Sequence, residues 1–161
     1  MAGTPDRAPA PVEIRIAVTE ADLAQVRSVR REVFVDEQNV PEELEYDELD
    51  ATSVHLLAVG PDGTGLGTGR LIHGPEALKL TGVEGRVLLG RLAVLKAARG
   101  TGLGADLVRA IEQAGRERGA RELELHAQTQ ALGFYERLGY TAEGPVYEDA
   151  GIPHRTMVRV F

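Results

Sequence analysis

The sequence of 161 residues suits a single domain with a sizeable core, because 43% of its residues are hydrophobic. It contains no cysteine, which excludes disulfides, thiolate metal sites and cysteine nucleophiles. The formal net charge of −7 argues against a nucleic-acid partner, because binding to phosphates needs a basic face.

Residues 1–12 differ in composition from the rest of the chain. They are rich in proline and alanine and lack the apolar core of a signal peptide. We interpret them as a flexible tail ahead of one domain over residues 13–161. No apolar run approaches the roughly 20 residues that a membrane-spanning helix needs. We therefore expect a cytoplasmic protein that does not associate with membranes.

The domain begins with a predicted strand and helix. Charged and apolar residues alternate over 13–18, which predicts a strand. Thr19 lies three residues before Asp22 in a capping-box-like start, and the apolar spacing that follows predicts a helix over 19–34. The next segment, 36–50, contains eight acids and no base. We interpret it as a loop or short helix. Because of this segment, the negative charge of the chain is concentrated in one place.

A hairpin and a long strand are predicted next. Segments 53–60 and 65–74 have the composition of antiparallel strands, and residues 61–63 (Pro-Asp-Gly) form the turn between them. A glycine-punctuated loop then leads to a β-rich strand over 85–94.

The second half of the domain is predicted to alternate helices and strands. Apolar residues recur at every third or fourth position from Leu103, which predicts an amphipathic helix that ends near Gly119. A strand over 120–127 follows, and Thr129 caps the next helix. A strand over 154–161 closes the chain and, if exposed, offers pairing in a homodimer. The order of elements predicts one mixed α/β (α+β) domain.

A glycine-rich turn lies between the long strand and the amphipathic helix. Its sequence is RGTGLG, with Gly100, Gly102 and Gly104 alternating after Arg99. Successive N–H groups of such a turn at a helix N-terminus form an anion nest, which the helix dipole strengthens. Arg99 adds a cation at the rim, and side chains at the glycines would block the approach of phosphates. The turn therefore predicts a pyrophosphate cradle that needs no metal.

Three other interpretations of the glycines compete with the cradle. Gly100-x-Gly102-x-x-Ala105 fits a relaxed dinucleotide-binding fingerprint, with Glu122 or Glu124 about 20 residues further on to hold a ribose. However, the first glycine does not follow directly on the strand, and too little chain remains for the further βα units of that fold. A P-loop fails because no Gly-Lys-Ser/Thr follows. A merely structural turn leaves the basic residue and the density of glycines unexplained.

These residues resemble a known family. Arg99-x-x-Gly102-x-Gly104 after a strand is similar to the Q/R-x-x-G-x-G/A motif of the GCN5-related N-acetyltransferase (GNAT) superfamily, and FYERLGY (134–140) is similar to its second recurrent block. The segments VFVDEQNVPEELEYDELD, HAQTQALGFYERLGY and GIPHRTMVR further resemble the ElaA/YjcF-type subgroup. The resemblance covers residues 13–161. It implies a central mixed, mostly antiparallel twisted sheet with helices on both faces and a splayed parallel strand pair.

The resemblance also implies an activity and a cosubstrate. A GNAT-like enzyme transfers an acetyl group from acetyl-CoA to a primary amine by direct attack in a ternary complex, without a metal. The acceptor would be a small-molecule amine or a peptide amine. The strand over 122–127 would be the splayed neighbour. CoA would be bound by Leu92, Ala93 and Val94 at its pantetheine arm, and by Arg99, Gly100, Thr101, Gly102, Leu103 and Gly104 at its diphosphate.

Three residues are candidates for catalysis. Tyr135 falls where many relatives place the acid that protonates the departing thiolate, although it could simply pack on its helix face. An alkylamine with a pKa of about 10.4 must lose a proton, so a base is expected. Many relatives carry a carboxylate on the strand before the cradle, but 85–94 has none. Glu37 and His126 are the candidate bases; histidine titrates near neutral pH, although a strand-end histidine could be structural.

The acidic segment predicts a pocket wall for a cationic acceptor, with a solvated loop as the alternative. The candidate acceptor-binding residues are Gln38, Glu45, Asp47 and His154. Because no base is obvious, a non-catalytic acyl-CoA-binding sensor stays open as an alternative function. Succinyl- or propionyl-CoA also stays open as the donor, because the cradle holds the part that acyl-CoAs share.

Overall fold

The computed structural model describes residues 12–161, so the predicted tail lies outside the described residues except for Val12. Within the described residues, seven strands form one sheet in the order β1-β2-β3-β4-β5-β7-β6. They are β1 (Glu13–Ile16), β2 (Val54–Val59), β3 (Gly65–Ile72), β4 (Arg86–Val94), β5 (Glu122–Gln128), β6 (Thr141–Asp149) and β7 (Ile152–Val160). All neighbouring strands are antiparallel except β4 and β5, which are parallel.

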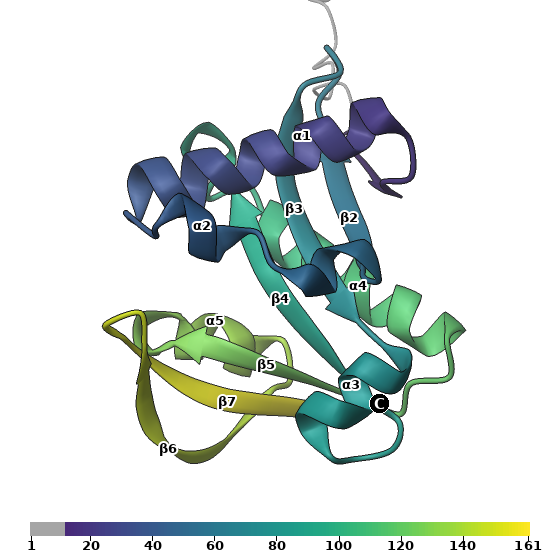
Figure 1. Cartoon of the computed structure of the whole chain (residues 1–161), viewed down its shortest axis with the longest axis vertical. Coiled ribbons are helices and arrows are strands. Elements are labelled where there is room, and N and C mark those ends of the chain that lie inside the picture. Colours follow the sequence, from purple (N-terminus) through teal and green to yellow (C-terminus); the bar gives the residue numbers. More distant parts are fainter. Residues whose placement is uncertain (1–11) are drawn as a thin grey trace, which may run out of the picture.

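Helices cover both faces of the sheet, with α1 on one face of β2–β4 and α4 on the other (Figure 1). The helices are α1 (Glu20–Arg30), α2 (Glu42–Glu45), α3 (Gly74–Thr81), α4 (Leu103–Glu117) and α5 (Leu132–Arg137). A π-helical turn, η1 (Arg31–Glu37), extends α1, and 3-10 turns occupy Glu48–Ala51, Lys96–Ala98 and Thr129–Ala131. The predicted mixed α/β domain is confirmed.

The helix α1 begins where the sequence predicts. The Thr19 side chain accepts a hydrogen bond from the Asp22 N–H at 3.1 Å, which caps the helix. Val26 packs with Leu57 of β2 on this face of the sheet, so the apolar spacing of the helix is used for burial.

The main core lies between α4 and the opposite face of the sheet. Leu107, Val108 and Ile111 of α4 are fully buried there. The helix approaches β3 closely at Gly69, where a Cβ would lie 2.4 Å from the Cδ1 atom of Ile111. A larger residue here would force Ile111 to move, so the close packing favours glycine and explains part of the glycine-rich sequence of β3.

Three expectations about elements are wrong. The loop predicted before β4 is largely the helix α3, which begins at Gly74-Pro75 because proline suits the first helical turn. Thr129 does not cap α5, since it opens a 3-10 turn and Ala131 precedes the helix without a side-chain cap. The closing strand, β7, lies between β5 and β6, so it has no free edge for pairing in a homodimer. The sheet edges are β1 and β6.

Candidate functional site

The parallel strands β4 and β5 separate halfway along their length. They pair from Arg86 with Glu122 to Leu89 with Leu125. Beyond these pairs β4 continues to Val94 along β3, and β5 continues to Gln128 along β7. The facing backbone groups of the two strands are therefore unpaired with each other in this region. This gap is the splayed parallel pair that the sequence predicts.

A bulge in β4 lies at the gap. The register between β3 and β4 shifts between Thr68 and Arg70, which gives β4 one extra residue around Arg91. Arg91 has a φ of 49°, in the left-handed region that non-glycine residues rarely adopt. Bulges of this kind turn a side chain in a new direction.

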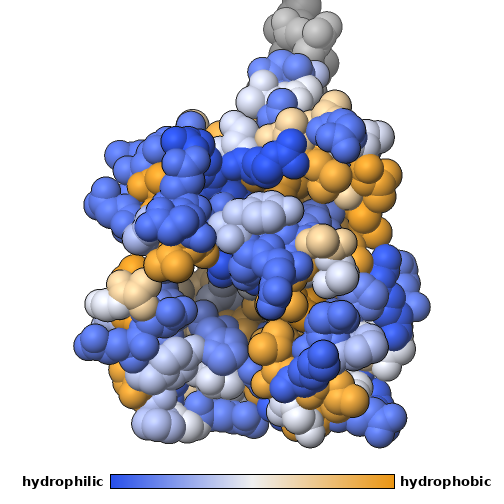
Figure 2. Space-filling model, viewed as in Figure 1, coloured by the Kyte–Doolittle hydropathy of each residue, from blue (hydrophilic) through white to orange (hydrophobic). Residues whose placement is uncertain are grey.

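A cavity of about 670 Å³ occupies the gap. Its walls come from β3, β4, β5 and α5, from the η1–α2 segment, and from the hairpin of β6 and β7. Figure 2 shows the hollow between the half of the molecule that carries α1 and α2 and the half that carries β5–β7. Leu92, Leu125 and Tyr135 contribute to its apolar part, and His126, His154 and Arg91 to its polar part.

The glycine-rich turn follows β4 and leads into α4. Gly100 and Gly102 have φ angles of 78° and 87°, and a Cβ on either would have nothing within 4 Å. Gly102 is the N-cap of α4 and supplies no side chain to its first N–H groups. Thr101 instead donates its hydroxyl to the Ala98 carbonyl at 2.6 Å. The turn therefore offers free N–H donors at a helix N-terminus with open space in front of them.

Arg99 forms a bidentate ion pair with Glu37. Its Nη1 and Nη2 atoms donate to the two Glu37 oxygens at 2.7 and 2.8 Å, while Nε donates to the Val94 carbonyl at 3.0 Å. The hydrogen bonds from Arg99 lower the pKa of Glu37. Glu37 is not among the cavity-lining residues, so the structure does not bring this candidate base together with His126 and Tyr135.

Tyr135 lies in α5 at the floor of the cavity. It is 8% exposed and packs edge-on against Phe134 and Tyr140. Burial raises the pKa of Tyr135 to about 12. The phenol is therefore protonated at neutral pH and available as a donor.

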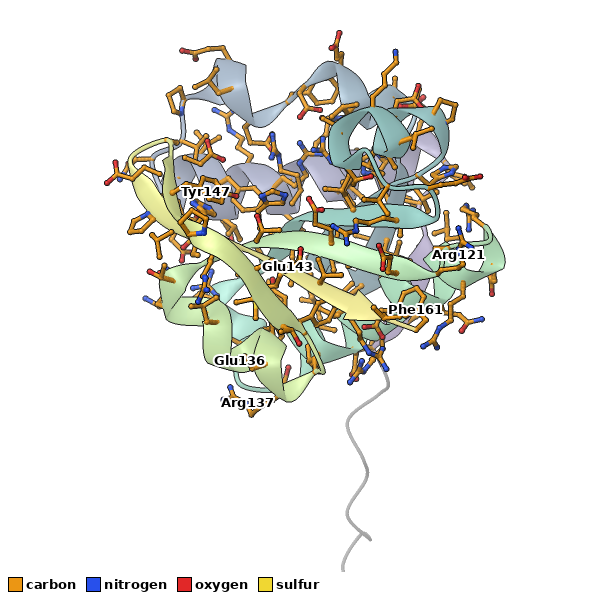
Figure 3. All side chains as sticks on the ribbon, turned by 90° about the horizontal axis from the view of Figure 1, so that it is seen from below. Arg121, Glu136, Arg137, Glu143, Tyr147 and Phe161 are labelled. Carbon is orange, nitrogen blue, oxygen red and sulfur yellow. The ribbon has the colours of Figure 1, made fainter. Side chains whose placement is uncertain are left out.

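His126 is joined to two residues that sequence reasoning missed. Its Nε2 atom lies 2.8 Å from an oxygen of Glu124, and its Nδ1 atom is hydrogen-bonded to the Tyr147 hydroxyl. The hydrogen bond from His126 lowers the pKa of Glu124, and Arg86 adds to the effect while burial opposes it. Glu124 thus stays ionised and fixes the tautomer with a proton on Nε2. Figure 3 shows Tyr147 near the tip of the β6–β7 hairpin.

A sequence signal for Glu124 did exist. In β5 the residues Glu122, Glu124 and His126 alternate with buried leucines, so they share one face of the strand. No comparable signal exists for Tyr147, because it reaches His126 from a strand 21 residues further along the chain.

The two aspartates near the end of the acidic segment are paired with arginines from other elements. Asp50 pairs with Arg30 at 2.5 Å and with Arg70 at 3.1 Å. Burial would raise the pKa of Asp50, but these arginines and the Asp47 N–H lower it to about 2. Asp47 pairs with Arg70 at 2.6 Å and with Arg91 at 3.3 Å. Neither aspartate lines the cavity, so Asp47 is not brought to the predicted acceptor wall.

The other acceptor candidates do line the cavity. Gln38 accepts a hydrogen bond of 3.4 Å from Gln128, which links the η1 side of the gap to the end of β5. His154 stacks on Tyr147 with ring centroids 5.9 Å apart. Glu45 lines the cavity with a side chain that is 11% exposed and paired with Arg30.

Two absences hold for residues 12–161, the part of the chain that the structure describes. No group of three or more histidine or acidic residues has the arrangement of a metal site. No helix there is both long and apolar enough to cross a membrane.

The chain is similar to known proteins over almost its whole length. The family model described as "Acetyltransferase (GNAT) domain" matches residues 19–161. The uncharacterized N-acetyltransferase YjcF of Bacillus subtilis is 39% identical, over 89% of this chain and 96% of YjcF. An acyl-CoA N-acyltransferase from Pseudomonas aeruginosa has a TM-score of 0.80 at 34% identity, covering 93% of this chain and 100% of that one. Escherichia coli ElaA has a TM-score of 0.79 at 26% identity, covering 92% and 99%.

Proposed function

Because the chain belongs to the GNAT family of acyl-CoA N-acyltransferases, we propose that it transfers the acetyl group of acetyl-CoA directly to a primary amine. The observation that carries this proposal is the gap between β4 and β5, which opens beside a turn of free N–H donors. The gap offers a strand-like partner to an extended chain, and the turn offers donors to an anion.

Acetyl-CoA would bind along these two features. The backbone of Leu92, Ala93 and Val94 would pair with the amides of the pantetheine arm through those groups that face the gap and are not already used by β3 or, at the Val94 carbonyl, by Arg99. The diphosphate would lie against the N–H groups of Gly100–Gly104, in the open space that a Cβ on Gly102 would enter. Arg99 would supply positive charge at the rim, and Glu37 would hold its guanidinium in place through their ion pair. We therefore assign Glu37 a positioning role, because a carboxylate with a lowered pKa is a weak base.

Tyr135 would assist the departure of the CoA thiolate. Its raised pKa keeps the hydroxyl protonated, and it lies at the floor of the same cavity as His126. A thiol with a pKa of about 8.5 is a good leaving group, so one hydrogen bond from a phenol is sufficient help.

His126 would accept the amine proton through Tyr147, which is not itself a cavity-lining residue but contacts two that are, His126 and His154. Both ring nitrogens of His126 are engaged, with Nε2–H donating to Glu124 and Nδ1 accepting from the Tyr147 hydroxyl. The proton of the attacking amine would pass to the Tyr147 oxygen while the hydroxyl proton moves to Nδ1. The imidazolium that forms would be stabilised by the Glu124 carboxylate.

The proposal is tested with purified protein, acetyl-CoA and a panel of amines, following the loss of thioester absorbance. Amine-dependent loss of the thioester is expected. Binding of acetyl-CoA without turnover of any amine would instead favour the sensor function. A cytoplasmic location and a homodimer remain predictions, and a dimer could not form by strand pairing at β7, which has no free edge.

The variant Gly102→Glu tests the cradle. We expect it to abolish CoA binding, because the new side chain would fill the anion site and repel the phosphates. Gly63→Glu is the matched control, since Gly63 has a φ of 84° and an equally open Cβ position but lies in the turn between β2 and β3. If isothermal titration calorimetry gave both folded variants the affinity of the wild type, the cradle would be excluded.

A further inference from the structure

Arginines, rather than free carboxylates, line the side of the cavity that β3, β4 and the η1–α2 segment form. Arg70 and Arg91 belong to its lining, whereas Asp47, which pairs with both, does not. Glu45 is the acid of the α2 segment that does line it, and its carboxylate is held by the Nε atom of Arg30 at 2.5 Å. The acidic segment therefore holds the arginines of this wall in place, and the charged groups that face the cavity here are mainly positive.

Arg91 has the properties of a ligand-binding arginine. Its side chain is 29% exposed, and the bulge in β4 together with a strained backbone fixes its direction. Nε donates to the Glu45 carbonyl at 3.1 Å, and Nη2 lies 3.3 Å from an Asp47 oxygen. Among the described residues, Nη1 of Arg91 has no hydrogen-bond partner. One donor edge of the guanidinium thus remains unused beside the cavity.

Arg70 lies behind Arg91 and also has unused donors. Its side chain is 5% exposed, and its buried Nε atom has no hydrogen-bond partner among the described residues. Its Nη2 atom lies 4.0 Å from where a Cβ on Gly90 would be, and Gly90 itself lines the cavity. Burial and the charges of Arg70 and Arg30 lower the pKa of Arg91, which marks this corner as a site that favours an anion.

We propose that the acceptor is an amine that also carries a carboxylate, as amino acids do, and that Arg91 binds this carboxylate with Arg70 behind it. A guanidinium matches a carboxylate in shape and charge, and this one is partly shielded from water. The opposite side of the cavity suits the amino group, because His126 and the exposed Asp149 line it there. This inference rests on the proposed function and specifies its substrate class.

The experiment compares amino acids with their decarboxylated counterparts. L-phenylalanine is paired with phenethylamine and L-lysine with cadaverine, and each is titrated calorimetrically into the protein saturated with CoA. The carboxylate-bearing member of each pair is expected to bind at least about 10-fold more tightly, as a charged hydrogen bond permits. The same ratio is expected in kcat/KM from thioester loss.

The variant Arg91→Met should reduce this ratio to near one, and Arg91→Lys should retain part of it. Arg31→Met is the matched control, because Arg31 is exposed, pairs with Glu42 and lies outside the cavity lining. It should keep the full preference. Circular dichroism and thermal melting verify that each variant is folded.

Each outcome has a distinct meaning. Equal or tighter binding of the decarboxylated amines, a preference that survives in Arg91→Met, or no binding of either class to the CoA-loaded protein would overturn the inference. Preferential binding of amino acids without loss of the thioester would support the inference and count against the proposed catalysis. The binding data therefore separate the failure of one from the failure of the other.

Discussion

At the scale of single residues, the hydrogen-bonded series Tyr147–His126–Glu124 is the part of the site whose proposed role in proton transfer is easiest to test. The Tyr147 hydroxyl is hydrogen-bonded to Nδ1 of His126, the nitrogen that would accept the proton if His126 is the base. It is therefore either the route of the proton or an obstacle to it. Tyr147→Phe keeps the ring that packs between His126 and His154 but removes the hydroxyl. If the hydroxyl is the route of the proton, its removal should lower kcat about 100-fold with little change in KM for acetyl-CoA.

Steady-state kinetics across a pH series measures this effect. Tyr46→Phe, on an exposed residue outside the cavity lining, is the control and should match the wild type. An increase in kcat for Tyr147→Phe would show that the hydroxyl blocks His126, and the relay would be wrong. Glu124→Gln should also lower kcat, because the amide cannot stabilise an imidazolium as a carboxylate does.

At the scale of elements, Glu112 ties α4 to the C-terminal strand. It is 2% exposed and accepts hydrogen bonds from Tyr140 at 2.7 Å, Arg159 at 2.7 Å and Arg109 at 2.9 Å. Glu112→Gln removes the charge that these donors surround. We expect it to lower the free energy of unfolding at pH 7 by about 3 kcal/mol, as for a broken buried pair. Urea unfolding measures the change, and Glu117→Gln on the exposed face of α4 should stay within about 0.5 kcal/mol of the wild type.

The same carboxylate gives the stability a pH dependence. Burial alone would raise the pKa of Glu112, but the hydrogen bonds from Arg109, Tyr140 and Arg159 outweigh it and lower the pKa below the ordinary 4.5. A group with a lowered folded-state pKa stabilises the fold above its unfolded pKa and loses that effect as the pH falls through the folded value. The difference between wild type and Glu112→Gln should therefore be constant above about pH 5.5 and shrink below 4.5. A difference that grew on acidification would contradict this account.

The elements that the sequence predicts well are those with a regular local pattern. The 3.6-residue spacing of α4 and the alternation in β5 follow from which face each element buries. β1 is a strand as predicted, although the burial of its residues does not alternate. The helix α3 is hard to predict because Gly74-Pro75 resembles a turn, although glycine with a positive φ followed by proline also starts a helix. The place of β7 in the sheet cannot be predicted from its own sequence, because it depends on partners elsewhere in the chain.

In the candidate site, too, local features could be predicted and features that depend on distant segments could not. The glycine turn is local, so its positive φ angles and its place before α4 could be predicted from six residues. The charges of the site could not, because they depend on contacts between distant segments. Arg99 meets Glu37 across 62 residues, and Arg91 meets Asp47 across 44. Five acids of the segment that looks acidic in sequence are therefore paired with arginines once it is folded.

At the scale of the whole molecule, the gap divides the sheet into two parts that join at four residue pairs between β4 and β5. A ligand lying in the gap and in the glycine turn contacts both parts, and this site exists only when the chain is folded. Binding should therefore stabilise the folded chain by mass action. At 100 times its Kd this amounts to about 2.7 kcal/mol. For a chain of this size that corresponds to a rise in Tm of roughly 5–10 °C.

Thermal denaturation with acetyl-CoA, CoA and NAD measures this stabilisation and discriminates among ligands. NAD shares the adenosine diphosphate of CoA but lacks the pantetheine arm, so it should raise Tm much less. Amide hydrogen exchange would show where the ligand binds, because pairing with pantetheine should slow exchange at Leu92–Val94. A rise with NAD equal to that with CoA, and no slowing at these amides, would mean that the ligand uses only the turn. The separation of β4 from β5 would then be a feature of the sheet without a role in binding.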